Sequence, residues 1–294
     1  MPRPTPSTIA TLAAVLVPAL GWAQAPSAAT PTTTELDRIT VTAREEAVAR
    51  ERAEAVASLD ADTIAGMRAT HANELLGRIP GVWASRGSGQ EQLLSIRSPV
   101  LTGPGACGAF LYLEDGVPIR PTGLCNVNQM FELNTEQAGR VEVLRGPGAA
   151  VHGSNALHGV INVVPRRPEE ATGRGVDVEI GPDRYARIQA GVGDAGGAAP
   201  WRLDAYALGS RSFRDEEGVD QQKLTAQMGF PEAPGAPRLL LSYANLNQET
   251  AGFIEGFQAY RDSRRFTNAN PEAFRDGRAW RAQGRWRWQP AEGV

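Results

Sequence analysis

The sequence of 294 residues has little lysine, histidine or cysteine, and its only long apolar run lies in the first 25 residues. A bundle of membrane-spanning helices needs repeated apolar runs of ~20 residues, so helical transporters are excluded and any membrane crossing must use strands. Lysine occurs once, at Lys223, and 30 basic against 33 acidic side chains give a net charge of −3. Because no basic stripe is present to follow phosphates, nucleic acid is not expected as a partner.

Residues 1–25 have the order of a secretory signal peptide. Arg3 precedes an apolar stretch from Ile9 to Leu20, and Ala23-Gln24-Ala25 is a small-x-small cleavage sequence. Pro18 would kink a lasting transmembrane helix. We therefore predict export with removal after Ala25, and the alternative is an uncleaved anchor.

The two cysteines, Cys107 and Cys125, are 18 positions apart. In an oxidising compartment they can form a disulfide, and the pairing is unambiguous if they pair. The alternative is a soft-metal site, but two thiolates would need further ligands. His152 and His158 have no carboxylate or thiol beside them. The sequence therefore favours a disulfide and predicts no metal site.

Composition divides the rest of the chain into three zones. Residues 26–54 begin with only Ala, Pro, Ser and Thr up to Thr34, as a flexible tether does. The following stretch, Glu35 to Ala43, is β-prone. Alone it would be an ordinary edge strand, and on a tether it could be captured by another protein through strand addition.

The second zone, residues 55–168, has the pattern of a compact α+β domain. Asn73 and Pro80-Gly81 bound one expected helix, from Asn73 to Arg78. The strands that we expect there are short and separated by Gly and Pro: Gly81 to Ala84, Leu93 to Arg97, Ala109 to Leu113, Arg140 to Leu144, and Gly159 to Val164. No set of nucleophile, base and orienting group is present, so an enzyme is not expected.

The third zone, residues 173–294, holds 14 of the 19 aromatic residues and alternates apolar and polar side chains. From Lys223 to Phe230, Lys, Thr and Gln share one face and Leu, Ala, Met and Phe the other. From Trp280 to Trp288, tryptophan and small residues occupy one face and Arg or Gln the other. We count about six such segments. A soluble sandwich would bury the apolar face, whereas an outer-membrane barrel turns it to lipid and turns the polar face to its lumen. The large charged side chains on the polar face favour the barrel.

Several stretches resemble the TonB-dependent outer-membrane receptors. Ile79-Pro80-Gly81-Val82 is similar to the start of the family's plug domain, and Asp115-Gly116-Val117-Pro118 is similar to a turn in it. The most specific stretch runs from Val141-Glu142-Val143-Leu144-Arg145-Gly146-Pro147 to Gly159-Val160-Ile161-Asn162-Val163-Val164. Ile96-Arg97 matches the family's Ile-Arg-Gly step, although Ser98 replaces the glycine.

The resemblance implies roles for individual residues. The eight residues after Glu35 resemble the TonB box, the peptide that pairs with TonB: Leu36, Asp37, Arg38, Ile39, Thr40, Val41, Thr42 and Ala43. Charged plug residues that lock against the barrel wall are expected at Arg97, Glu142 and Arg145. Outward loops would bind ligand through Arg86, Gln90, Arg120, Asn126, Asn128 and Gln129, and the disulfide would tie two of these loops together.

The expected molecule is a plug domain followed by the first strands of a transmembrane antiparallel β-barrel. The family barrel has about 22 strands, so about six strands imply an incomplete barrel and a truncated chain. The resemblance implies uptake of a ferric siderophore or another metal chelate, energised by TonB and its inner-membrane complex, with the plug and TonB box facing the periplasm and no cofactor. Cobalamin, copper or an oligosaccharide are alternative ligands. A stand-alone periplasmic plug-like binding module is a further alternative.

Overall fold

The computed structural model describes residues 55–100, 109–121, 128–170 and 173–287. The predicted signal peptide, the predicted tether, the predicted TonB box, Cys107, Cys125 and Asn126 lie outside these residues. Residues 55–170 are called the plug part, after the domain that they resemble. Residues 173–287 contain the six-stranded sheet.

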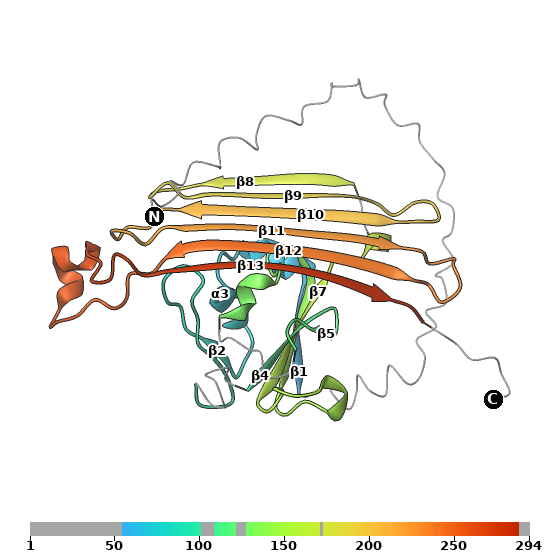
Figure 1. Cartoon of the computed structure of the whole chain (residues 1–294), viewed down its shortest axis with the longest axis horizontal. Coiled ribbons are helices and arrows are strands. Elements are labelled where there is room, and N and C mark those ends of the chain that lie inside the picture. Colours follow the sequence, from blue (N-terminus) through green and yellow to red (C-terminus); the bar gives the residue numbers. More distant parts are fainter. Residues whose placement is uncertain (1–54, 101–108, 122–127, 171–172, 288–294) are drawn as a thin grey trace, which may run out of the picture. The chain divides into compact units, whose positions relative to one another are not determined.

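The plug part contains a five-stranded sheet in the order β1-β6-β7-β4-β5 and a separate hairpin, β2-β3 (Figure 1). Pairing is antiparallel except between β4 and β7, which run parallel. The strands are β1 (Val56–Asp60), β2 (Val82–Ala84), β3 (Leu94–Ile96), β4 (Phe110–Glu114), β5 (Val117–Pro118), β6 (Ala138–Arg145) and β7 (Gly159–Pro165). β6 and β7 lie at the centre of this sheet, which matches the stretch that carried the resemblance.

Two short helices connect β1 to the hairpin. Helix α2 (Ala61–Met67) begins at Asp60, whose side chain accepts a hydrogen bond from the Thr63 amide, and ends at Arg68 in the left-handed conformation. Helix α3 (Ala72–Leu76) is capped by His71. The sequence predicted α3 within two residues at each end but missed α2, so the expectation of one helix was wrong. The cap at Asp60 was the available signal.

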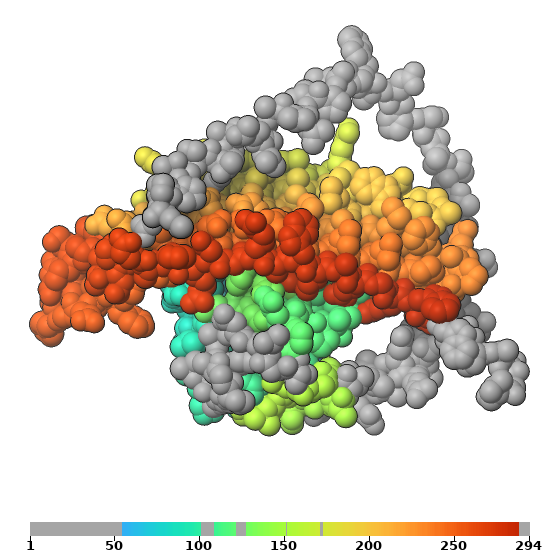
Figure 2. Space-filling view, in the orientation of Figure 1, coloured from blue at the N-terminus to red at the C-terminus, as the bar shows by residue number. Residues whose placement is uncertain are grey.

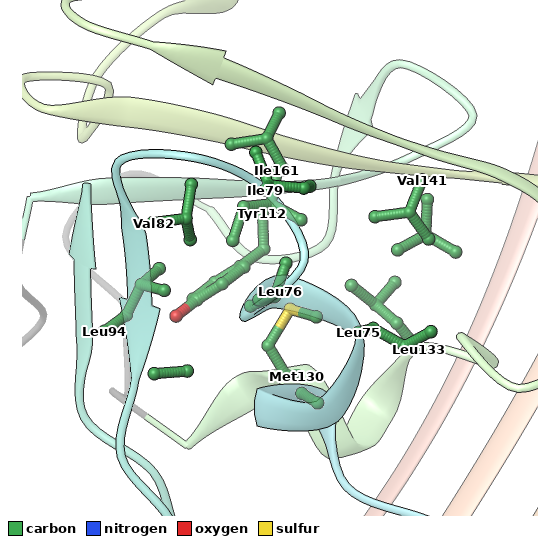
Figure 3. Packing of buried hydrophobic residues seen from close by; sticks show 14 of the residues in the cluster. Leu75, Leu76, Ile79, Val82, Leu94, Tyr112, Met130, Leu133, Val141 and Ile161 are labelled. Atoms are coloured by element: carbon green, nitrogen blue, oxygen red, sulfur yellow. The ribbon is translucent and has the colours of Figure 1, made fainter. Parts of the chain in front are cut away.

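The apolar core of the plug part lies between these helices, the hairpin and the mixed sheet. Leu75 and Leu76 of α3 pack with Tyr112, Val141 and Ile161 from the sheet (Figure 3). Met130, within a 3-10 turn (Gln129–Glu132), and Leu133, directly after this turn, belong to the same core (Figure 3). Burial of an aliphatic side chain contributes about 1.5 to 3 kcal/mol, so this cluster is the main source of the domain's stability.

The second part is one antiparallel sheet in the order β13-β12-β11-β10-β9-β8, so each strand pairs with its neighbour in sequence (Figure 1). Its strands are β8 (Arg174–Ile180), β9 (Ala186–Asp194), β10 (Trp201–Ser210), β11 (Val219–Gly229), β12 (Arg238–Glu249) and β13 (Phe274–Arg285). The described strands do not close into a barrel. The six strands and the α+β part before them confirm the predicted fold class.

The two faces of this sheet have opposite character. Large apolar side chains are exposed on one face, including Ile180, Leu241 and Trp280, which is 72% exposed. Polar side chains on the other face, such as Lys223 and Gln227, are buried against the plug part. The predicted alternation is therefore confirmed along β11 and β13. The polar face of the sheet is buried and the apolar face is exposed, whereas a soluble sandwich would bury its apolar face.

Candidate functional site: the interface between plug part and sheet

The single lysine forms the most enclosed ion pair of the interface. The Lys223 ammonium, on β11, donates to both Glu136 carboxylate oxygens at 2.8 Å and to the Leu133 carbonyl at 2.7 Å. The two side chains are only 2% and 4% exposed. Three acceptors match the three donors of an ammonium group, so the charge is fully compensated inside the interface. Loss of one partner from such a pair costs roughly 3 to 5 kcal/mol, because a buried charge is left unpaired.

Arg281 of β13 joins two buried carboxylates of the plug part. Its guanidinium reaches Glu114 at 2.9 and 3.1 Å, Glu132 at 3.3 Å and the Glu132 carbonyl at 2.7 Å. Ser242 of β12 also donates to Glu114, at 2.7 Å. Figure 2 shows β13, in red, along the green surface of the plug part. The planar fork of arginine suits a site in which two carboxylates must be satisfied together.

A second arginine cluster surrounds the turn after β4. Asp115 has a left-handed backbone and pairs with Arg238, with Arg285 at 3.4 Å and with Arg167 at 3.5 Å. Burial raises the pKa of the Asp115 carboxyl, and the guanidinium groups of Arg167 and Arg285 act in the opposite direction. The Asp-Gly-Val-Pro turn that supported the resemblance is therefore also a contact point with β12 and β13.

Arg187 connects the first sheet strands to helix α2. Its side chain is 1% exposed, pairs with Glu179 at 2.6 Å and donates to the Arg68 carbonyl at the end of α2. Arg68 in turn pairs with Asp177 of β8 at 3.0 Å. The interface thus has charged contacts at β8 and β9 as well as at β11 to β13.

The β2-β3 hairpin is held at its tip by a glutamine of the sheet. The side chain of Gln248, in β12, accepts a hydrogen bond from the backbone amide of Gln90 at 2.8 Å and donates one to the Ser88 carbonyl at 3.2 Å. On the other side of the tip, the Gln90 side chain donates to the Thr70 carbonyl at 2.8 Å. Gln90, predicted to bind ligand, is therefore buried between the plug part and the sheet.

His71 supports the same hairpin from α3. Its Nε2 lies 3.0 Å from the Glu91 carbonyl, which can only accept, so Nε2 carries the proton and Nδ1 accepts from the Asn73 amide at 3.1 Å. Burial, and then the charge of Arg86, lowers the pKa of His71 below its usual value of 6.5, while Glu74 acts in the opposite direction. The neutral imidazole is thus the form that fits this position.

The three residues predicted to lock the plug to the wall make contacts inside the plug part. Arg145 donates to the carbonyls of Ala55 and Pro80, both at 3.2 Å. Glu142 accepts from Asn162 at 2.8 Å and from Arg140. Arg97 has a left-handed backbone and its amide donates to Gly81. Their role as a lock stays a prediction.

Sequence reasoning missed the residues that join the two parts: Lys223, Glu136, Glu114, Asp115, Arg238 and Arg281. The alternation placed Lys223 and Arg281 on the polar face. The carboxylates that they meet are about 90 to 170 positions away in sequence, and only the tertiary structure pairs them.

The other predicted ligand residues are in varied surroundings. Arg86 forms an exposed pair with Glu74 at 2.8 Å, and Arg120 pairs with Glu132. Asn128 is buried and accepts from the Gln92 amide at 2.7 Å. Gln129 and Arg120 line a small, partly open hollow beside Tyr112 and Ile119. Ligand binding by these side chains stays a prediction.

Within the described ranges, no helix is long and apolar enough to cross a membrane. In the same ranges, no three His, Cys, Asp or Glu side chains are grouped so that they could hold a metal ion. The buried carboxylates of the interface are instead paired with arginine and lysine.

Comparison with known proteins agrees with this architecture. Residues 48–160 match the family model described as the TonB-dependent Receptor Plug Domain. Among solved structures, the unliganded ferric citrate transporter FecA is 22% identical with a TM-score of 0.64, over 81% of this chain and 38% of that chain. The match with P. aeruginosa FpvA bound to a heterologous pyoverdine has 17% identity and a TM-score of 0.53, covering 68% and 26%.

The copper transporter OprC is 16% identical with a TM-score of 0.54, over 68% of this chain and 32% of that chain. The chain thus spans about a quarter to two fifths of the length of these proteins. At these identities the structures show a shared fold. Residues 48–160 thus match the plug-domain family, and the solved structures share the fold in which such a domain precedes antiparallel strands; within the described residues these strands do not close into a barrel.

Proposed function

We propose that the chain acts in TonB-dependent uptake of a scarce nutrient across the outer membrane, with a ferric siderophore or another metal chelate as ligand. The observation that carries this proposal is the reversed burial of the six-stranded sheet. Its polar face holds a folded domain through ion pairs, and its apolar face is exposed. A lipid-facing outer surface and a plugged lumen account for both faces.

The interface suits a domain that must be held and later moved. Charged contacts such as Lys223 with Glu136 fix the plug part, yet the apolar core around Leu76 lies wholly within that part. Displacement of the plug would therefore expose polar surfaces to water and leave its core intact. In this proposal TonB, energised by the inner-membrane complex, pulls on residues 36–43 from the periplasm.

Iron chelates are favoured because two of the similar structures are receptors for them. FecA is a ferric citrate transporter, and FpvA was solved as an iron complex with a pyoverdine. OprC, a copper transporter, has the same fold, which makes copper the second candidate. Cobalamin and an oligosaccharide are further alternatives to a ferric chelate as the ligand. A stand-alone periplasmic plug-like module would be soluble without detergent.

Binding to the detergent-solubilised chain would test the ligand class. Calorimetric titration would use ferric citrate, a ferric catecholate, a ferric hydroxamate, cupric ion and cobalamin. We expect saturable binding of at least one ferric chelate and none of its iron-free form. Binding of copper or cobalamin alone, or of no ferric chelate, would contradict the proposed ligand. Full extraction of the chain without detergent would favour the periplasmic module.

The TonB contact needs a separate experiment. Replacement of residues 36–43 by a Gly-Ser segment of equal length should abolish binding of the chain to the periplasmic domain of TonB. The matched control replaces residues 26–33, another eight-residue piece of the tether, and should bind as the original chain does. Equal binding by both variants would exclude residues 36–43 as the TonB box.

A further inference from the structure

We propose that Gln248 is a positioning residue for ligand recognition, because it fastens the tip of the β2-β3 hairpin (residues 87–91) to the sheet. The tip and the β12–β13 connection (residues 250–273) would then form one recognition unit. This inference rests on the proposed function, in which the hairpin loop faces the ligand. The side chain itself need not touch ligand, since it acts through the backbone of the tip.

The hairpin continues beyond its strands through backbone hydrogen bonds. The Ser85 amide donates to Leu93 at 2.8 Å, and the Gly87 amide donates to Glu91 at 2.8 Å. At the end of the hairpin the Glu91 amide donates to Ser88 at 2.9 Å. A buried backbone amide requires a partner, and that of Gln90 has its partner outside the hairpin.

Gln248 supplies that partner with both ends of its side-chain amide. Its carbonyl oxygen accepts from the Gln90 amide at 2.8 Å, and its amino group donates to the Ser88 carbonyl at 3.2 Å. The side chain is 3% exposed. The Gln248 side chain thus pairs with one backbone N–H and one backbone carbonyl of the tip, as a neighbouring strand would. These two bonds fix the orientation of the side-chain amide.

The residue at the centre of the tip is suited to this close approach. Gly89 has φ of +55°, and a Cβ placed there would lie 2.5 Å from the Gln248 carbonyl oxygen and 2.8 Å from Cδ. Both the backbone conformation and the space therefore favour glycine. The tip is built around the Gln248 side chain, and a larger residue would have to displace it.

Further contacts join the tip to the start of the β12–β13 connection, to the loop before β11 and to β13. The Ser88 hydroxyl accepts from the Ala251 amide at 3.2 Å and donates to Glu217 at 2.9 Å. Arg275, in β13, pairs with Glu91 at 2.9 Å. The tip therefore contacts the start of the connection and the strand that follows it. Phe253 and Phe257 in this connection are highly exposed, so a ligand bound against them would lie on a segment that the tip contacts at its start through Ala251.

Hydrogen exchange on the full chain in detergent tests the fastening directly. Gln248→Met keeps the length of the side chain but removes both hydrogen bonds, so the Gln90 amide should exchange about tenfold faster. The matched control is Gln227→Met, since Gln227 also donates from the sheet to the plug part, at the Arg166 carbonyl. It should leave Gln90 unchanged. Unchanged exchange in Gln248→Met, or equal acceleration in both variants, would overturn the proposal.

A double-mutant comparison tests the contact with Gly89. Gly89→Ala alone should accelerate exchange throughout the tip, because the added methyl group collides with Gln248. In the Gln248→Ala background the same change should have a clearly smaller effect, since only the strain of positive φ remains. Strictly additive effects would contradict a direct contact.

Ferric citrate binding then tests the role in recognition. If the original chain binds ferric citrate, Gln248→Met should weaken that binding severalfold while Gln227→Met does not. Equal affinity in all three proteins would refute the positioning role. If the original chain does not bind ferric citrate, the proposed function loses its support for this chelate, and the exchange experiments still decide whether Gln248 fastens the tip.

Discussion

The plug part buries mainly apolar side chains, whereas the six-stranded sheet buries polar side chains and exposes apolar ones. The plug part surrounds an apolar core, with Leu76 and Ile161 fully buried. The sheet buries Lys223 and Gln221 and exposes Leu241 and Trp280. Apolar residues are buried where water is the surrounding solvent, whereas lipid reverses the preference. Under the proposed function the exposed apolar face of the sheet meets lipid, while its polar face meets the plug part.

The largest loss of stability at the interface is expected when Arg281, which pairs with two buried carboxylates, is removed. Arg281→Ala would leave Glu114 and Glu132 buried without their shared partner, a change that costs roughly 3 to 5 kcal/mol. We expect the plug part to become sensitive to protease while the strands stay paired. Arg278→Ala is the control, because Arg278 lies on the same strand and is exposed. Equal protease resistance in both variants would show that the interface does not depend on this cluster.

A core substitution should affect the plug part through packing. Leu76→Ala removes a side chain with no exposed surface, which typically costs roughly 2 to 5 kcal/mol. The loss of unfolding free energy would be measured by urea unfolding of the plug part, with hydrogen exchange in β6 and β7 as the probe. A change below about 1 kcal/mol would mean that the core around α3 is loosely packed.

Acidification should weaken the plug part through His71. Its pKa is lowered in the folded state, so its contribution is fully present above the ordinary value near 6.5 and is lost as the pH falls below it. Protonation would turn Nδ1 from an acceptor into a donor and break the cap of α3. The charged groups around the imidazole are Arg86 and Glu74, and Glu91 contacts it through its backbone carbonyl.

His71→Asn provides the comparison, because asparagine also caps helices and does not titrate. Stability of the original chain should fall between pH 7 and pH 5 more steeply than that of this variant. Parallel pH profiles, measured as urea midpoints in the same detergent, would exclude His71 as the titrating group.

The smallest effect is expected on the exposed face of the sheet. Leu241→Ala repeats the substitution made at Leu76, but Leu241 is 57% exposed. In detergent the change in unfolding free energy should stay within about 0.5 kcal/mol, as for other surface positions. A loss as large as that of Leu76→Ala would mean that this face is buried against protein, as in a sandwich.

The sequence predicted the sheet better than the interface for a physical reason. Alternation along β11 and β13 depends on neighbouring residues, so Lys223 and Arg281 could be assigned to the polar face from local pattern alone. Motifs of the plug domain located β6 and β7 correctly. Helix α2 was missed because it is one of two short helices and its signal is a single cap at Asp60.

Partners across the interface could not be predicted in the same way. The contact of Lys223 with Glu136, or of Gln248 with Gln90, depends on how the plug part and the sheet meet. Neither side of such a contact has a local pattern that reveals the other. Arg97, Glu142 and Arg145 were assigned to the interface by resemblance, and their described contacts lie within the plug part.

The most direct measurement is a double-mutant cycle between Lys223 and Glu136, with Lys223→Met, Glu136→Leu and the double variant. Hydrogen exchange at the plug face that meets β11 would report the free energy of separation. Each single change should destabilise the interface strongly, whereas the double variant, which leaves no unpaired charge, should lie close to the original chain. Additive losses in the double variant would contradict an interface held by compensated buried charge.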